Sequence, residues 1–249
     1  AINIPDGPRA SARISPVITA LSIQNEAKIE AVLHVCCRDR NLIGMQSDLL
    51  GCAASRINNI LFITGDPPKL GDYPFASAVL HVDSIGCLEI AGKLNTGLDL
   101  AGKSIGQVTN FFGGSGADPN ALDKVREINR LRLKVQAGAQ YIITQPVFDI
   151  EPLLAMIAAV ADLNVPIIAG IWPLSSLRNA QFMKTEVPGV VVPDEVMEKM
   201  ARYSNQDDQR KMGIEIARET YAKLRPYIAG LQVSAPFGNV KSALEVFKI

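Results

Sequence analysis

Short apolar segments alternate along the chain with longer segments whose apolar residues recur at helical spacing. Most of the short segments are continuously apolar and rich in β-branched residues, which is typical of parallel strands buried on both faces. This pattern predicts strands at residues 2–4, 31–36, 59–64, 105–111, 141–144, 166–170 and 231–234. It predicts helices at residues 15–24, 45–55, 121–137, 152–160, 194–201 and 210–225.

The helix predicted at residues 121–137 has boundary signals at both ends. Asp118 precedes Pro119, an order that suits a capping carboxylate followed by a proline in the first helical turn. Gly138 follows the last helical residue, where glycine commonly ends a helix.

The alternation of strands and helices predicts an α/β fold with parallel strands. A closed (β/α)8 TIM-type barrel needs eight strands, whereas the pattern offers seven. We therefore expect one barrel domain over residues 1–249 that lacks its first strand and helix in this chain. An open seven-stranded sheet is the alternative. No repeat, low-complexity tract or linker divides the sequence.

The composition is that of an ordinary globular protein, with 48% hydrophobic and 20% charged residues and a formal net charge of zero. It predicts neither a nucleic-acid partner nor a membrane surface. No apolar run reaches the roughly 20 residues that a bilayer requires, and no signal peptide opens the chain. Cys36, Cys37, Cys52 and Cys87 have no zinc-binding spacing. We expect reduced thiols, no metal site and a cytoplasmic location.

Polar and glycine-rich residues follow the predicted strands, and the carboxyl ends of strands are where a barrel places its chemistry. Each candidate also has a structural reading. His34 lies within an apolar strand, where a lone histidine is more often a satisfied core residue. Asp66 is equally well explained as a partner of backbone amides in its Gly-Asp-Pro-Pro turn. Residues 113–116 read either as a flexible connection or as a loop that approaches a phosphate.

Three further candidates carry charge or amide groups. The run from Arg38 to Arg40 reads best as a solvated cluster of salt bridges, at least for Arg40. Lys134 in its helix would usually face solvent. Gln145, between Thr144 and Pro146 at a strand end, is harder to explain structurally. A glutamine there can both donate and accept hydrogen bonds, as recognition of a heterocycle edge requires.

An ordered set of strings resembles the methylenetetrahydrofolate reductase family. The strings are HVCCRD (34–39), ITGDPP (63–68), GDYP (71–74), KVQAGA (134–139) and ITQPVFD (143–149). Three more, GIWP (170–173), NAQF (179–182) and VSAPF (233–237), are similar to the branch in which the reductase is fused behind a homocysteine methyltransferase domain. Each string alone is a weak signal, but their order and spacing cover essentially the whole chain.

The resemblance implies a (β/α)8 barrel that carries FAD at the carboxyl ends of its strands. It implies reduction of 5,10-methylenetetrahydrofolate to 5-methyltetrahydrofolate by NAD(P)H, in a ping-pong reaction through the flavin. By matching motif, these residues would contact the FAD: Asn3, His34, Thr64, Gly65, Asp66, Tyr73 and Lys134, with Glu127 and Arg130 as weaker candidates.

The resemblance also implies individual roles. Asp66 would place negative charge beside the flavin and pterin and tune hydride transfer, and Lys134 would meet the phosphates of the cofactor. Gln145 would bind the pterin and take part in catalysis. An aromatic residue after the sixth strand would help to hold the substrate, and Phe182 or its neighbour Met183 falls there.

The family places a general-acid glutamate on the first barrel strand, which we expect upstream of Ala1. Two alternatives to the reductase are therefore kept: a flavin- or folate-binding module without complete catalytic machinery, and a subunit of a redox complex. Expected small-molecule partners are methylenetetrahydrofolate and NAD(P)H. A homo-oligomer and a fused or associated methyltransferase or redox partner are both left open.

Overall fold

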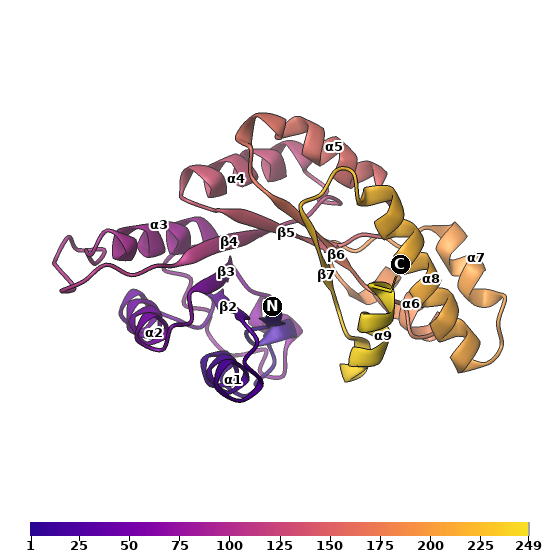
Figure 1. Cartoon of the computed structure of the whole chain (residues 1–249), viewed down its shortest axis with the longest axis horizontal. Coiled ribbons are helices and arrows are strands. Elements are labelled where there is room, and N and C mark those ends of the chain that lie inside the picture. Colours follow the sequence, from indigo (N-terminus) through magenta and orange to yellow (C-terminus); the bar gives the residue numbers. More distant parts are fainter. Residues whose placement is uncertain (249) are drawn as a thin grey trace. The chain divides into compact units, whose positions relative to one another are not determined.

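The structure is a computed structural model that describes residues 1–248. The chain divides into two compact units. The first contains residues 1–116 and 133–140, and the second contains residues 117–132 and the chain from residue 141 onward. Strands and helices alternate along both units (Figure 1).

The first unit is built on parallel strands. They are β1 (Ile2–Ile4), β2 (Ala31–Cys36), β3 (Asn59–Ile63) and β4 (Phe112–Ala117), whose last residue falls in the second unit. Each strand pairs in parallel with the next, with Asn3 opposite Val32 and Leu61 opposite Gly114. The helices of this part are α1 (Pro16–Ser22), which runs on into a π-helical turn (Ile23–Ala27), α2 (Leu42–Ala54) and α3 (Ser84–Asn95).

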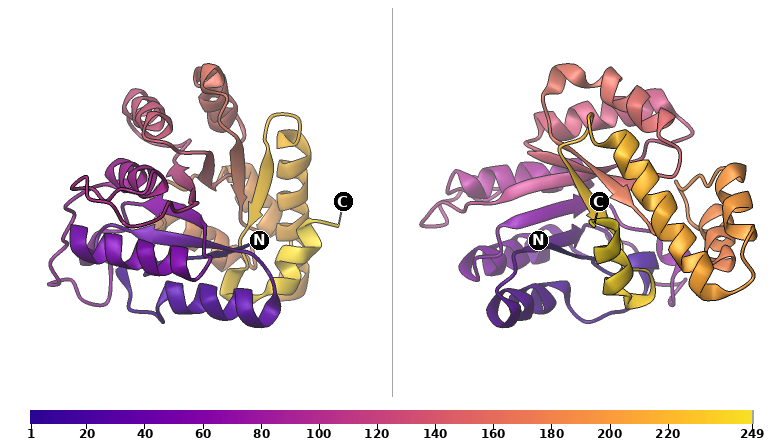
Figure 2. Two further views of the ribbon diagram at one scale, coloured as in Figure 1. Left: turned by 60° about the vertical axis from the view of Figure 1, so that its left-hand side comes forward. Right: turned by 45° about the vertical axis from the view of Figure 1, so that its right-hand side comes forward.

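The second unit contains three strands that also pair in parallel, β5 (Tyr141–Pro146), β6 (Ile167–Ile171) and β7 (Gly230–Val233). Its helices are α5 (Glu151–Ala159), α6 (Leu177–Glu186), α7 (Asp194–Ala201), α8 (Gln206–Leu224) and α9 (Val240–Val246). Figure 2 shows α9 against α8, which it contacts. Helix α4 (Lys124–Gln136) begins among residues of the second unit and ends among residues of the first.

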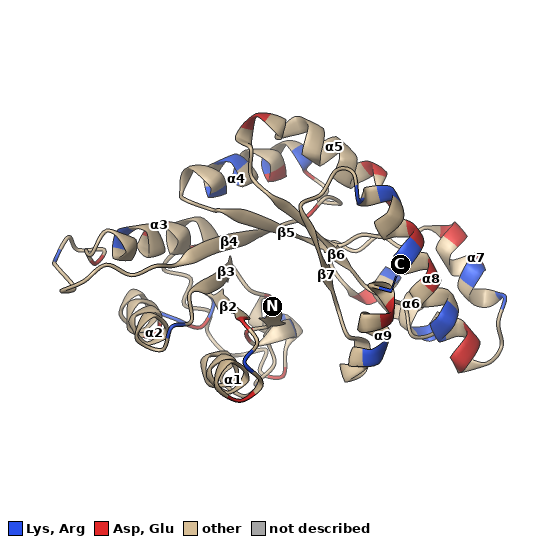
Figure 3. Cartoon of the chain, in the orientation of Figure 1, with Lys and Arg blue, Asp and Glu red and all other residues tan. Residues whose placement is uncertain are grey.

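Most residues of the strands are buried or half-buried. No strand in the described part of the chain contains Asp, Glu, Lys or Arg, and these residues lie on helices and connections (Figure 3). Leu33, Ile60 and Phe62 are fully buried in the first unit. In the second unit, Met183 and Met200 belong to a core cluster between the helices and the connections. Burying such side chains contributes about 1.5–3 kcal/mol each.

Most predicted elements are confirmed, and so is the α/β class with parallel strands. The fourth predicted strand is wrong, because the strand is β4 at residues 112–117 and not the apolar run at 105–111. Asn95 holds that run in an irregular path through hydrogen bonds to Thr109 and to both backbone groups of Phe111. Residues 113–116 are therefore a paired strand, neither a flexible connection nor a loop. A Cβ at Gly113 would meet the Phe62 ring and Leu88 at 3.4 Å, so glycine allows close packing there.

The start of α4 also differs from the prediction. Asp118 lies in a turn before the helix, and its Oδ1 accepts a hydrogen bond from the Asn120 backbone N–H. Asp123 occupies the capping position instead, since its Oδ1 accepts from the Arg126 N–H. Gly138 is confirmed as the glycine that ends the helix, with φ of +105°. Helices α3, α6 and α9 were not among the predicted elements.

Two further findings concern the cysteines and the length of the helices. Cys36, Cys37, Cys52 and Cys87 are free and buried. Burial raises the pKa of the Cys36 thiol to about 11, so it is protonated at neutral pH. None of the helices in residues 1–248 has the length and apolarity needed to span a bilayer.

Candidate functional site

The carboxyl edge of the first unit, meaning the residues that directly follow β1, β2 and β3 and the end of β4, is polar and tightly bonded. Asp6 follows β1, and its Oδ2 accepts from the Cys36 backbone N–H at 2.9 Å and from the Arg40 guanidinium at 2.6 Å. Arg40 also pairs with Asp48 at 2.8 Å. The side chains of Arg40 and Asp6 are only 15% and 8% exposed. The expectation of a solvated cluster is therefore wrong, because this pair is buried between two strand ends.

Arg38 joins two connections at this edge. Its side chain is 5% exposed and donates to both carboxylate oxygens of Asp39. Its guanidinium also donates to the carbonyl of Asp66 at 3.1 Å and to that of Gly7 at 3.4 Å. The bond with Asp39 raises the pKa of Arg38, so the guanidinium stays charged. Arg38 thus fixes the connection after β1 to the connection after β3.

Asp66 is held at this edge from two directions. Its backbone carbonyl is bonded to Arg38, and its Oδ2 accepts from the Arg9 backbone N–H at 2.8 Å. The preceding Gly65 has φ of +92°, and a Cβ there would lie 2.0 Å from the Cys36 sulfur. Only glycine fits that position. The structural reading of Asp66 as a partner of a backbone amide is confirmed, yet its side chain is exposed.

His34 and Asn3 are brought together on adjacent strands. The His34 Nε2 lies 3.1 Å from the Asn3 Oδ1. Burial lowers the pKa of His34 from its ordinary 6.5 to about 4, so the imidazole is neutral at neutral pH. A neutral ring bonded to an amide agrees with the reading of His34 as a satisfied core residue.

We predict that His34 makes the protein less stable in mild acid. The unfolded chain binds a proton on this residue near pH 6.5, whereas the folded chain does so only near pH 4. The stabilising contribution is therefore complete above pH 6.5 and is lost as the pH falls towards 4. The free energy of unfolding, measured with urea, should lose about 2 kcal/mol from this group between about pH 7 and 4.5. The variant His34→Gln should lack that loss, and the control His81→Gln should keep it. Equal pH dependence in His34→Gln and wild type would contradict the assignment.

Lys134 is buried, which corrects the expectation that it faces solvent. The residue is 7% exposed, and its Nζ donates to the carbonyl of Gly116 at 2.7 Å. Its positive charge therefore lies at the carboxyl end of β4.

Thr64 is exposed, and its carbonyl accepts from the Cys36 thiol at 3.3 Å.

An aromatic pair stands on the connection after β3. Tyr73 is 54% exposed and Phe75 is 86% exposed, and their rings meet edge to face with centroids 6.4 Å apart. The sequence prediction included Tyr73 and missed Phe75. Such large apolar rings in solvent are the kind of surface that a planar ligand covers.

In the second unit, an irregularity of β5 sets the position of Gln145. The register between β5 and β6 shifts between Ile143 and Pro146, as in a β-bulge. Thr144 fills the irregularity, because its Oγ1 accepts from the Gly170 N–H and donates to the Gln145 carbonyl. A bulge commonly turns one side chain out of the strand's alternation. The Gln145 side chain is exposed.

The other predicted residues of the second unit have different surroundings. Glu127 accepts a hydrogen bond from the Asp118 backbone N–H at 3.0 Å. Burial, with the Glu127 carboxylate nearby, raises the pKa of Asp118. Arg130 is half-buried on the same helix. Met183 is 2% exposed and packs in the core, whereas Phe182 is 36% exposed. Of these two neighbours, only Phe182 is accessible to a ligand.

The family model for methylenetetrahydrofolate reductase matches residues 1–229. The chain belongs to this family. Three curated relatives illustrate the match. Methylenetetrahydrofolate reductase 1 of Schizosaccharomyces pombe is 26% identical over 234 residues, covering 86% of this chain and 34% of the relative. Methylenetetrahydrofolate reductase (NADH) 1 of Arabidopsis thaliana is 26% identical, covering 82% and 35%. The 5,10-methylenetetrahydrofolate reductase of Pectobacterium carotovorum is 26% identical, covering 80% and 62%.

The chain spans about a third of the length of these two eukaryotic members of the methylenetetrahydrofolate reductase family. Sequence reasoning missed Asp6, which lies outside the family motifs, and the structural importance of Arg38, which lies in the string HVCCRD. The available signal was position, because both residues directly follow predicted strands whose carboxyl ends share one edge.

Proposed function

We propose that this chain is the reductase part of a flavoprotein that converts 5,10-methylenetetrahydrofolate to 5-methyltetrahydrofolate. The reaction consumes NAD(P)H and a proton and releases NAD(P)⁺. The observation that best supports the proposal is the family match over residues 1–229 together with an exposed, doubly held Asp66 at the carboxyl edge. We further propose that residues 1–249 belong to one (β/α)8 TIM-type barrel domain, and that the chain is related to the branch fused to a homocysteine methyltransferase.

The residues of the first unit fit FAD by their chemistry. Lys134 places a positive charge at the end of β4, which suits a diphosphate, and the Tyr73 and Phe75 rings offer an apolar surface. Gly65 allows a close turn of the backbone beside Asp66. When bound, the flavin supplies the capacity to accept a hydride from the nicotinamide and to pass it to the folate.

The remaining roles belong to side chains of the chain itself. Asp66 holds a negative charge at the carboxyl edge, and its bonds to Arg9 and Arg38 keep that charge in one place. Such a fixed charge stabilises a positively charged substrate centre without reorganisation during the reaction. Gln145, exposed at the bulge of β5, offers an amide donor and acceptor to the pterin edge. Phe182 offers a ring face to the substrate.

A spectrum and two activity assays test the proposal. The full-length protein that contains this chain should bind FAD with an absorption band in the visible range. It should oxidise NAD(P)H with methylenetetrahydrofolate as well as with menadione. Absence of bound flavin after FAD is added would refute the proposal. Menadione turnover without folate turnover would favour the non-catalytic binding module, and turnover only with an added protein would favour a subunit of a redox complex.

For Gln145→Ala we predict weaker folate binding. Loss of the amide leaves polar atoms of the bound pterin without partners, which costs about 1–3 kcal/mol and so raises the folate dissociation constant roughly 5-fold to 150-fold. The measurement is equilibrium titration of the flavoprotein with 5-methyltetrahydrofolate. The control is Gln107→Ala, an exposed glutamine in another connection. Equal dissociation constants for Gln145→Ala and Gln107→Ala would rule out the role.

A further inference from the structure

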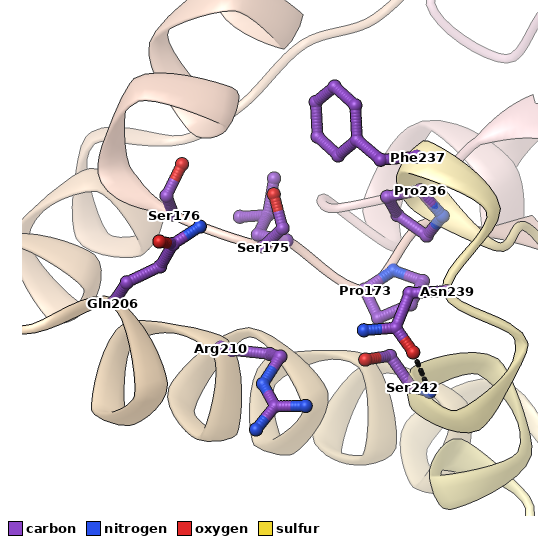
Figure 4. A pocket seen from close by; sticks show the side chains of 10 residues that line it. Pro173, Ser175, Ser176, Gln206, Arg210, Pro236, Phe237, Asn239 and Ser242 are labelled. Carbon is purple, nitrogen blue, oxygen red and sulfur yellow. Dashed lines mark hydrogen bonds between the residues drawn. The ribbon is translucent and has the colours of Figure 1, made fainter.

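A hollow of about 420 Å³ opens within the second unit at the carboxyl ends of β6 and β7 (Figure 4). The connection after β6, the start of α8 and the connection after β7 with α9 form its wall. In α/β sheets, ligands bind outside the carboxyl ends of the strands. The polar residues that line the hollow are Ser175, Ser176, Gln206, Arg210, Asn239 and Ser242. None of them is among the residues that the family motifs implicate.

The charge around the hollow is positive. Among the described residues that line it, Arg210 alone is charged. Its guanidinium lies 3.1 Å from Asp207, but the Asp207 side chain is 79% exposed. An ion pair so open to solvent contributes little, so a ligand carboxylate can replace Asp207 at small cost. Ser176 caps the start of α6 at this wall and Gln206 is the first residue of α8, so the positive ends of both helix dipoles add to the same sign.

Besides the positive charge, a buried hydroxyl at Ser242 independently indicates that the hollow binds a ligand. The residue is 5% exposed, and its Oγ is buried without a hydrogen-bond partner among the described residues. The Ser242 backbone N–H is already bonded to Asn239, and in Figure 4 the hydroxyl is turned towards α8 and Arg210. A buried hydroxyl without a partner is destabilising. A ligand oxygen in the hollow would satisfy it.

The wall is rigid, as a preformed site requires. Asn179 is 5% exposed, and its Oδ1 accepts from the Trp172 ring N–H and from the Ser175 backbone N–H. Gln209 of α8 accepts from the Leu177 N–H. A Cβ at Gly213 would lie 1.9 Å from the Leu174 carbonyl oxygen, so α8 and the connection after β6 are in direct backbone contact.

We propose that this hollow binds the carboxylate end of a small-molecule ligand, with Arg210 pairing with the carboxylate and Ser242 donating a hydrogen bond to it. Two sources have this chemistry. One is the glutamyl end of the folate, and that arm rests on the proposed function. The other is a free dicarboxylate, which needs no folate reaction at all.

Calorimetric titrations of the full chain with three probes separate these sources. The probes are glutarate, 5-methyltetrahydrofolate and 5-methyltetrahydropteroate, which lacks the glutamate. Either glutarate binds directly, or the glutamate of the folate strengthens binding relative to the pteroate. For whichever of these ligands binds through its carboxylate, Arg210→Gln should weaken the affinity at least tenfold and Ser242→Ala severalfold. The control Lys211→Gln, next to Arg210 but 72% exposed and paired with Asp208, should bind as wild type does.

Several results would overturn the proposal. One is glutarate that does not bind while folate and pteroate bind equally, which leaves the proposed function intact. Another is an equal loss of affinity in Arg210→Gln and Lys211→Gln, which would reduce the effect to net charge. Conversely, Arg210-dependent glutarate binding with neither folate nor pteroate bound would support the hollow and defeat the proposed function. Ser242→Ala separates a ligand-binding role from a purely structural one. If Ser242 had only a structural role, the variant would bind the ligand as wild type does and would be equally or more stable.

Discussion

Asp66→Asn is expected to slow the folate half-reaction roughly a hundredfold to a thousandfold while FAD remains bound. Asparagine is nearly the same size as aspartate and keeps an oxygen that can accept from the Arg9 N–H, so the turn after β3 should survive. What is lost is the negative charge at the carboxyl edge. Stopped-flow absorbance should show the slow folate half-reaction, and a redox titration should show a shifted flavin potential.

A matched control for Asp66→Asn is Glu89→Gln, which removes the same charge from an exposed site on α3. Its two half-reactions should match those of wild type, because exposed charges at a distance are screened by salt. If both half-reactions are as fast in Asp66→Asn as in wild type, Asp66 has only the structural role of bonding the Arg9 backbone.

Asp6→Ala is expected to destabilise the protein by about 3–5 kcal/mol, the usual cost of removing one partner of a buried ion pair. The change leaves the 15%-exposed Arg40 without its shorter carboxylate contact. It also removes the acceptor of the Cys36 backbone N–H at the end of β2. Urea unfolding followed by circular dichroism should show a much lower midpoint for the transition that includes the first unit.

The control for Asp6→Ala removes the other carboxylate that pairs with Arg40. Asp48 also pairs with Arg40, but its side chain is 46% exposed. Asp48→Ala should therefore cost no more than about 1 kcal/mol. Similar unfolding midpoints for the two variants would show that the burial of Asp6 contributes nothing to the strength of the pair.

The sequence predicted the bounds of strands and helices well where an apolar or amphipathic pattern repeats along the segment. Strands β1 and β2 and helix α7 have the predicted bounds, because a continuous apolar run or an amphipathic repeat is a property of neighbouring residues. The sequence also placed His34, Asp66 and Gln145 correctly in or directly after strands, whereas their roles in a functional site stay predictions. The closed barrel and the flavin contacts stay predictions.

Strand β4 shows where local pattern fails. Its sequence FGGSGA contains little apolar surface, and its strand character comes from pairing with β3 over residues 59–62. Gly113 fits there because Phe62 and Leu88 occupy the space a side chain would need. A neighbour about 50 residues away in sequence leaves no periodic trace in the strand that it selects.

The sequence by itself determined three things: the alternation of strands and helices, the ordered set of family motifs, and the position of candidate side chains at strand ends. Only the tertiary structure decided which charges are buried. Arg40, Arg38 and Lys134 look like surface residues from their neighbours, yet they are 15%, 5% and 7% exposed. The physical reason is that burying a charge requires partners. Asp39 and Asp48 are near in sequence, but Asp6, Gly7 and Gly116, which complete the pairing, are distant.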